Sequence, residues 1–295
     1  MKNQFIITCE STCDLPYSYL VQRGVPVIFY KFVINGKQFE DNADRDKRAS
    51  EQFYKQIAEG GLPSTSQINA FEYEEFFNGV LKEHDCDILH IAFGTGMTPS
   101  YFKALEAVKN ISTKHKIVVI DSLCSSSGYG LLVDEALDMR DNDCKMSEIQ
   151  DYLMQNRNKI HHQFFSTDLT LFKRSGRVSG LSAMLAGILD INPIMHLNAE
   201  GRIIAYAKVR GKKRSIQKTA SEILEHADGG SEYCGKLFIA HSDCEDLALQ
   251  MKDEIQKIMP NQVGKIRLLN IGLIIASHCG KGTVAVFFHG DERKL

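Results

Sequence analysis

The first half of the chain alternates short apolar segments of strand length with amphipathic segments of helical spacing, and this alternation constrains the fold most. The strand-like segments are residues 4–8, 25–34, 87–93 and 116–121, and the helix-like segments are residues 15–23, 50–60, 71–84, 100–112 and 130–142. Asn35-Gly36 is typical of a two-residue hairpin turn. Near-continuous apolar strands separated by amphipathic helices are typical of a parallel sheet that helices cover on both faces. The pattern therefore predicts an N-terminal α/β domain built on a parallel sheet.

The second half of the chain follows a different order. Helix-like segments are residues 147–160, 215–227 and 245–259, and strand-like segments are residues 194–198, 202–209, 236–242 and 283–290. The first two of these strands look like a hairpin around Glu200-Gly201. This mixture predicts a C-terminal α/β domain with a mixed sheet. At roughly 150 residues per domain, a chain of 295 residues is expected to form two domains. We place them at residues 1–157 and 158–295.

The composition excludes several classes of protein. The net charge is −2, with 35 basic and 37 acidic residues, whereas proteins that bind DNA or RNA usually carry a basic excess. Mean hydropathy is −0.20, and every apolar run is shorter than the roughly 18 residues that a membrane span needs. Residues 1–12 lack the apolar core of a secretion signal. We therefore expect a cytoplasmic protein without a transmembrane segment.

The cysteines and histidines do not predict a metal site or a cofactor. None of the 8 cysteines forms a C-x-x-C pair, so we expect reduced thiols. His161 and His162 are adjacent, and on a strand they would face opposite sides, so joint metal ligation is not expected. The segment from Gly280 to Thr283 lacks the spacing of a phosphate-binding P-loop, and the other common catalytic motifs are absent from the sequence.

Three segments rich in hydroxyl groups lie at residues 63–67, 94–100 and 121–128. Ligands of parallel sheets bind where the strands deliver their carboxyl ends. In the second segment, Thr98 is expected to be the N-cap of the next helix and Pro99 its first residue. A helix N-terminus there favours an anion. Helix capping alone remains the alternative interpretation of these hydroxyl groups.

The second half contains further candidate segments with two open interpretations each. Residues 173–177 and 210–214 are basic and are either solvated turns or a docking surface for a phosphate-bearing partner. The expected helix at residues 181–187 is rich in small residues, which suits either a lipid chain or close helix packing. His278, in a glycine-rich turn at residues 276–283, is either structural or functional.

Together these segments resemble the DegV family of bacterial fatty-acid-binding proteins, and the resemblance runs nearly end to end. The segments that carry it are CESTCDLP (9–16), TSQ (65–67), TGMTPSY (95–101), DS (121–122), KRSGRV (173–178), INPI (191–194), KVRGKKR (208–214) and HCGKG (278–282). Each segment is weakly specific by itself, but their order along the chain is specific. Glu10, Thr98 and Pro99 depart from the aspartate, serine and glycine that are usual in the family.

The resemblance implies a two-domain DegV-like α/β fold and a buried long-chain fatty acid, with no other cofactor. It implies that the hydroxyl groups of Thr65 and Thr98 hold the carboxylate and that Arg177 and His278 lie near the head group. The remaining residues expected at this ligand site are Ser66, Thr95 and Gly96.

The resemblance also implies that the protein is not itself the catalyst. Family members present the acid to a separate ATP-dependent kinase, which forms an acyl phosphate. The basic residues Arg210, Lys212, Lys213 and Arg214 are the expected docking site for that kinase, and transient contact with a membrane surface is compatible with this role. The alternative is a phosphotransferase or hydrolase that acts on a small polar substrate through His278. A third interpretation, a regulator of transcription, is disfavoured by the net charge of −2.

Overall fold

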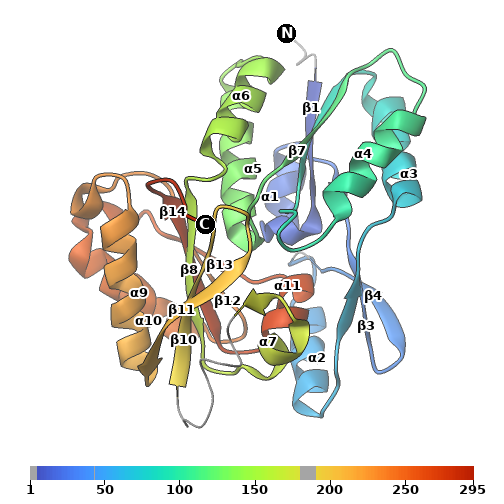
Figure 1. Ribbon diagram of the computed structural model, residues 1–295. Coiled ribbons are helices and arrows are strands. Elements are labelled where there is room, and N and C mark those ends of the chain that lie inside the picture. Colours follow the sequence, from blue (N-terminus) through green and yellow to red (C-terminus); the bar gives the residue numbers. More distant parts are fainter. Residues whose placement is uncertain (1–4, 43, 180–190) are drawn as a thin grey trace.

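The computed structural model describes residues 5–42, 44–179 and 191–295 (Figure 1). It contains three β-sheets, and helices separate and cover them. The helix predicted at residues 181–187 lies outside the described residues. No helix among the described residues combines the length and the apolar character needed to cross a membrane.

The first sheet is parallel, as predicted, with the strand order β2-β1-β6-β7. Its strands are β1 (Phe5–Glu10), β2 (Val27–Ile28), β6 (Asp87–Ala92) and β7 (Ile117–Asp121). Helices α3 (Ala70–His84) and α4 (Ser100–Asn110) lie on one side of it, and α1 (Tyr17–Gln22), α5 (Ser126–Asp141) and α6 (Met146–Asn156) lie on the other side (Figure 1). Because both faces are covered, every residue of β1 is buried.

The segment predicted as one strand at residues 25–34 is two strands in different sheets. Strand β2 pairs with β1, whereas β3 (Lys31–Ile34) pairs with β4 (Lys37–Glu40) and β5 (Ser64–Ser66) in a three-stranded antiparallel sheet. The chain changes sheet at Tyr30, whose N–H donates to Ser11 Oγ at 3.2 Å and whose hydroxyl donates to Glu10 at 3.0 Å. The prediction of a hairpin at Asn35-Gly36 is confirmed, and both residues have positive φ.

The second large sheet has seven strands, in the order β13-β12-β14-β8-β10-β11-β9, and is mixed as predicted. Its strands are β8 (Ile160–Ser166), β9 (Val178–Ser179), β10 (Ile191–Leu197), β11 (Ile203–Arg210), β12 (Leu237–His241), β13 (Arg267–Asn270) and β14 (Thr283–His289). The predicted hairpin is confirmed as β10 and β11. Strands β8, β9 and β13 are absent from the strands that the sequence predicted for this half of the chain. The position of the domain boundary near residue 158 stays a prediction.

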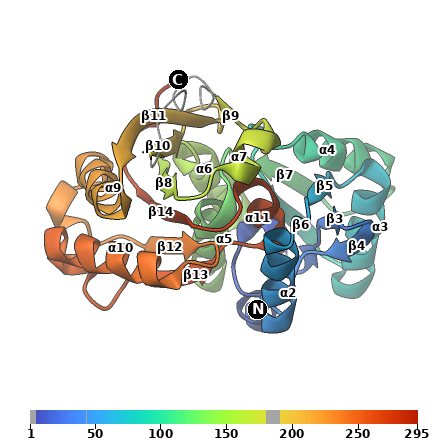
Figure 2. The same cartoon turned by 90° about the horizontal axis from the view of Figure 1, so that it is seen from below.

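Helices pack on both faces of the seven-stranded sheet. The described helices of this half are α7 (Thr170–Ser175), α9 (Lys212–His226), α10 (Glu245–Ile258) and α11 (Leu273–Cys279), and α2 (Lys47–Ala58) of the first half lies beside them. Short 3₁₀ turns lie at Ser11–Cys13, Gly230–Glu232 and Pro260–Gln262. In Figure 2, α9 and α10 cover the outer face of this sheet, and α5, α7 and α11 lie on the face that looks toward the parallel sheet.

Helix α5 is buried between the two large sheets. A side chain at position 128 would begin 2.3 Å from His162 Nε2, and one at position 130 would begin 2.3 Å from the carbonyl oxygen of Cys13. Gly128 and Gly130 therefore allow α5 to approach both neighbours closely. The first turn of α5 is thereby placed between the sheets.

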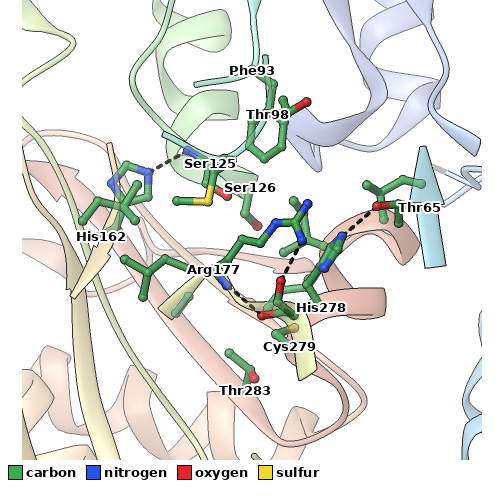
Figure 3. A pocket seen from close by; sticks show the side chains of 18 of the residues that line it. Thr65, Phe93, Thr98, Ser125, Ser126, His162, Arg177, His278, Cys279 and Thr283 are labelled. Carbon is green, nitrogen blue, oxygen red and sulfur yellow. Dashed lines mark hydrogen bonds between the residues drawn. The ribbon is translucent and has the colours of Figure 1, made fainter. Parts of the chain in front are cut away.

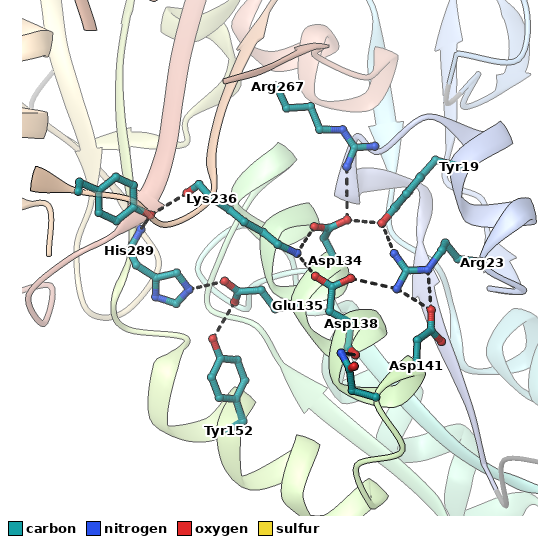
Figure 4. Close-up of polar contacts among 12 residues, drawn as sticks. Tyr19, Arg23, Asp134, Glu135, Asp138, Asp141, Tyr152, Lys236, Arg267 and His289 are labelled. Carbon is teal, nitrogen blue, oxygen red and sulfur yellow. Dashed lines mark hydrogen bonds and ion pairs between the residues drawn. The ribbon is translucent and has the colours of Figure 1, made fainter. Parts of the chain in front are cut away.

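An ionic group, which we call the α5 ion cluster, joins α5 to the second sheet. It comprises Arg23, Asp134, Asp138, Lys236 and Arg267 (Figure 4). Lys236 pairs with both aspartates, Arg267 lies 3.3 Å from Asp134, and Arg23 lies 3.1 Å from Asp138. Each charge of the cluster therefore has a partner of opposite sign within it.

Candidate functional site

A cavity of about 240 Å³ lies between the parallel sheet and the seven-stranded sheet. Its lining is mostly apolar and includes Phe93, Phe164, Phe172, Leu197, Ile203, Ile271, Ile274, Ala285 and Phe287. Polar side chains reach the cavity from several elements that are far apart in the sequence (Figure 3). The combination of an apolar chamber with a few convergent polar groups is typical of a small-molecule site.

Thr65 and His278 meet at the cavity wall. Thr65 lies on the edge strand β5, and its Oγ1 is 2.8 Å from His278 Nε2 (Figure 3). The prediction that His278 lies in a turn is wrong, because it lies in the last turn of α11, and Gly280, with a φ of 71°, ends that helix. Burial and the nearby positive charge of Arg177 lower the pKa of His278 to about 4. His278 is therefore neutral at pH 7 and has one ring N–H to donate.

Arg177 brings a positive charge to the same wall. Its Nη1 donates to the carbonyl oxygen of Ser175 at 2.6 Å, and its own N–H donates to Ser175 Oγ at 3.2 Å. The left-handed Gly176 ends α7 and lets the chain reverse at this point. Within the described part of the chain, no carboxylate pairs with Arg177. The guanidinium therefore keeps donors for an anion.

A smaller, more polar recess adjoins this corner of the cavity. Its volume is about 170 Å³, and it shares Thr65, Arg177 and His278 with the main cavity. Arg174 contributes a second guanidinium to its lining. The corner therefore offers two guanidinium groups and the Thr65 hydroxyl as hydrogen-bond donors.

Thr98 and Ser66 also line the cavity. The prediction that Thr98 caps α4 is wrong, because Pro99 is the N-cap and Ser100 is the first helical residue. The hydroxyl of Thr98 contacts Ser100 Oγ at 3.1 Å instead of a backbone N–H. We call Thr65, Thr98, Arg177 and His278 the cavity cluster.

Thr95 and Gly96 are not among the residues that line the cavity. The hydroxyl of Thr95 donates to Asp121 Oδ2 at 2.6 Å, and its N–H donates to Oδ1 at 3.1 Å. A side chain at position 96 would begin 2.2 Å from the carbonyl oxygen of Gly201. These two residues thus fix the loop before α4 against β7 and against the β10–β11 turn.

Comparison with known proteins identifies the family. A family model described as an uncharacterised protein, DegV family, matches residues 4–291. The chain belongs to the DegV family. A DegV domain-containing protein of Clostridium perfringens is 32% identical over 294 residues, which covers 99% of each chain. A DegV domain-containing protein of Lactococcus lactis is 27% identical over 286 residues, which covers 96% of each chain.

Solved structures of DegV proteins share the two-domain fold. One from Thermus thermophilus, described under fatty acid binding of a DegV family protein, has a TM-score of 0.84 at 22% identity and covers 98% of this chain and 100% of its own. One from Thermotoga maritima, described as a DegV lipid-binding protein, has a TM-score of 0.82 at 24% identity and covers 99% of this chain and 100% of its own. The resemblance seen in the sequence and the predicted fold class are thereby confirmed.

In this DegV chain, the cavity also contains polar residues that the sequence-based site lacks. Ser125 and Ser126 begin α5, and Ser126 has a φ of 53° and donates its hydroxyl to buried Asp14. Burial raises the pKa of Asp14 well above its usual range. His162 also lines the cavity, and its Nε2 accepts the N–H of Ser125 at 3.1 Å. The hydroxyl-rich segment 121–128 contains the two serines and could have indicated them, whereas no local sequence pattern points to His162.

The basic residues predicted to dock a partner form one exposed stretch of this DegV chain. Arg210 ends β11, and Lys212, Lys213 and Arg214 form the first turn of α9. Positive charges at a helix N-terminus oppose the helix dipole, so this arrangement does not stabilise α9. Among the described residues, no carboxylate forms an ion pair with any of the four. The stretch therefore remains open to an external anionic group.

Proposed function

We propose that this protein binds a long-chain fatty acid in the cavity, with the carboxylate at the cavity cluster. The observation that carries the proposal is the convergence, at one wall of a mostly apolar chamber, of the Thr65–His278 pair and Arg177, which pairs with no carboxylate among the described residues. The Thermus thermophilus and Thermotoga maritima relatives, described as fatty-acid- or lipid-binding, support the same ligand class. We place this binding in the cytoplasm.

The energetics favour a ligand with one charged end and a long apolar tail. A sixteen-carbon acid has about fourteen methylene groups, each worth ~0.8 kcal/mol when buried, or roughly 11 kcal/mol in gross terms. A buried carboxylate would oppose binding unless its oxygens are hydrogen-bonded. Hydroxyl groups and a guanidinium offset that cost through charge-assisted hydrogen bonds.

The histidine has a specific part in this arrangement. Neutral His278 donates its Nε2–H to Thr65 Oγ1, which frees the Thr65 proton for a carboxylate oxygen. The histidine thus orients the hydroxyl without contributing a charge, and Arg177 supplies the positive charge. Thr98, which also lines the cavity, is the second hydroxyl donor that we propose.

Two variants test the head-group site. Thr65→Val and Thr98→Val keep the side-chain shape but remove a donor to a charged acceptor. Each should weaken fatty-acid binding by about 1.5–3 kcal/mol, measured by displacement of a fluorescent fatty acid. Thr113→Val, at an exposed position that lines neither the cavity nor the recess, is the matched control. Unchanged affinity in both threonine variants, at equal thermal stability, would place the carboxylate elsewhere.

We also propose that the protein presents the bound acid to a separate ATP-dependent kinase, which docks at Arg210, Lys212, Lys213 and Arg214. The polar recess beside the Thr65–His278 pair, with Arg174 in its lining, is suited to the phosphoryl group of an acyl phosphate. Catalysis then belongs to the kinase, and this protein supplies the acyl group.

Replacing Lys212, Lys213 and Arg214 by serine tests the docking surface. The change should slow acyl-phosphate formation by the kinase while fatty-acid affinity stays the same. The loss should shrink as ionic strength rises, because salt screens such a patch. Turnover and lipid displacement are measured side by side at two salt concentrations. Equal loss of both activities would show that the stretch serves the fold or the cavity.

The Thr65–His278 pair also supports a second candidate, a hydrolase in which the threonine is the nucleophile and the histidine its base. Such a pair normally needs a third group that orients the second ring nitrogen of the base. Within the described residues, no hydrogen-bond partner of His278 Nδ1 is found, which favours the binding protein. Hydrolysis of p-nitrophenyl esters by the parent protein, together with its loss in Thr65→Val, would support the hydrolase instead.

A further inference from the structure

Three side chains with metal-binding atoms converge on the face of the seven-stranded sheet that lies opposite the cavity. They are His161 of β8, His226 in the last turn of α9, and Asp291 directly after β14. One ligand atom from each lies within 4.8 Å of the others. Asp291 Oδ1 is 3.0 Å from His161 Nε2 and 3.0 Å from His226 Nδ1. Within the described ranges of the chain, no other histidine, cysteine and carboxylate groups converge in this way.

We propose that His161, His226 and Asp291 bind a divalent transition-metal ion, zinc in the first place. Two imidazoles and one carboxylate, with the fourth position left to water, form a donor set that zinc accepts, and cobalt and nickel accept it as well. With metal–ligand bonds of about 2.0–2.2 Å, tetrahedral donors lie about 3.3–3.6 Å apart. Because the ligand atoms lie within 4.8 Å of one another, metal binding would draw them together by up to about 1.5 Å through side-chain rotation.

Two features of the surroundings favour a cation, whereas the positive charge of the nearby Arg293, which helps to lower the pKa of His161, opposes it. His226 ends α9, and a helix C-terminus stabilises positive charge. Glu222 Oε2 lies 3.9 Å from His226 Nε2, the nitrogen that would carry the proton when Nδ1 binds the metal. Carboxylates in that position orient metal-bound imidazoles. The nearby guanidinium of Arg293 donates to the carbonyl oxygen of Leu123 and so does not occupy Asp291.

The backbone holds the ligands together. The N–H of Asp291 donates to the carbonyl oxygen of His226 at 3.1 Å. A side chain at position 290 would begin 2.1 Å from that same oxygen and 3.0 Å from the ring of His161. Gly290 therefore lets the C-terminal segment pass close enough for Asp291 to face both imidazoles. A bound ion would fasten this segment to β8 and α9.

The sequence does not reveal this group, because its members lie far apart along the chain. His161 and His162 face opposite sides of β8, as expected: His161 stacks on His226 with ring centroids 5.0 Å apart, whereas His162 packs edge-on against Phe287. The two adjacent histidines thus serve the outer face and the cavity, respectively.

The test uses untagged full-length protein that has been stripped with EDTA and dialysed. The protein is titrated with zinc chloride in a calorimeter and with cobalt chloride while the visible absorption of four-coordinate cobalt is recorded. The parent should bind one ion at least about tenfold more tightly than His226→Ala and Asp291→Asn, and zinc should raise its melting temperature. His115→Ala is the matched control, because His115 contacts Asp85 at 2.8 Å and Asp87 at 3.5 Å through different ring nitrogens and, among the described residues, belongs to no three-residue group of this kind.

The expected result is a cobalt spectrum and a zinc-dependent stabilisation that both variants lose and the control keeps. Equal melting temperatures of parent and variants in EDTA would show that the substitutions leave the fold intact. Absence of zinc binding to the parent would overturn the proposal, and so would equal binding by both variants. In either case, the three side chains would act only as a hydrogen-bonded clamp on the C-terminal segment.

Discussion

The cavity cluster and the α5 ion cluster are both groups of polar and charged side chains, but they differ in how their charges are paired. In the α5 ion cluster, Lys236 and Arg267 face carboxylates at short range, so the charges are satisfied within the protein. In the cavity cluster, His278 is neutral, and Arg177 has no carboxylate partner within the described residues. Paired charges stabilise a fold, whereas unpaired donors around an apolar chamber indicate a ligand.

The largest change in ligand affinity is expected for Arg177→Gln. The substitution removes the only guanidinium that we assign to the carboxylate, so fatty-acid affinity should fall by about 2–3 kcal/mol, or roughly 30- to 150-fold. Thermal stability should stay the same, because the side chain is exposed. Arg202→Gln, which removes an exposed arginine paired with Glu200, is the control. Affinity like that of the parent would mean that Arg177 does not meet the ligand.

The opposite outcome is expected at the α5 ion cluster. Lys236→Met removes a partner of the buried Asp134 and of Asp138, and should lower the free energy of unfolding by about 1–2 kcal/mol, since Lys236 is partly exposed. Fatty-acid affinity should not change. Chemical denaturation and lipid displacement measure the two quantities, with Lys257→Met, at a surface pair with Glu254, as the control. A parallel loss of affinity would show that the two clusters are energetically coupled.

A smaller effect concerns pH. The folded-state pKa of His278, about 4, lies below the unfolded value of about 6.5. Its contribution to stability is therefore fully present above pH 6.5 and is lost as the pH falls toward 4. Between pH 7.5 and 5.5 the loss should be about 1 kcal/mol. His278→Gln should lose less stability than the parent over this interval.

Denaturation curves at several pH values give the difference between His278→Gln and the parent. This difference isolates His278 from His161, whose pKa burial also lowers to about 4. Identical pH profiles for both proteins would mean that His278 keeps its ordinary pKa in the folded state.

Local sequence pattern predicted most of the fold, and the family resemblance predicted part of the site. The apolar strands of the first half predicted the parallel sheet, and Asn35-Gly36 predicted the hairpin. Thr65, Arg177 and His278 were assigned through the family resemblance, and the structure brings them to one wall. The sequence did not show that the chain changes sheets at Tyr30, because that change depends on hydrogen bonds to the distant Glu10 and Ser11.

The loop before α4 shows why the rest of the site could not be predicted. Thr95 carries a hydroxyl and sits beside glycines, as an anion site would, yet Asp121 takes up that hydroxyl. Asp121 ends a different strand, so only the pairing of β6 with β7 brings the two residues together. Likewise, the helix that carries His278 is short and ends at Gly280, so the local sequence resembles a turn.

Native mass spectrometry of the purified protein shows directly whether it binds a long-chain fatty acid. The parent should carry one long-chain fatty acid per chain, or take up one from an added mixture after lipid removal. The occupancy should fall strongly in Thr65→Val combined with Arg177→Gln, while Lys236→Met keeps it. A parent protein that neither retains nor takes up a fatty acid would contradict fatty-acid binding. A double variant as fully occupied as the parent would contradict binding of the carboxylate at the cavity cluster.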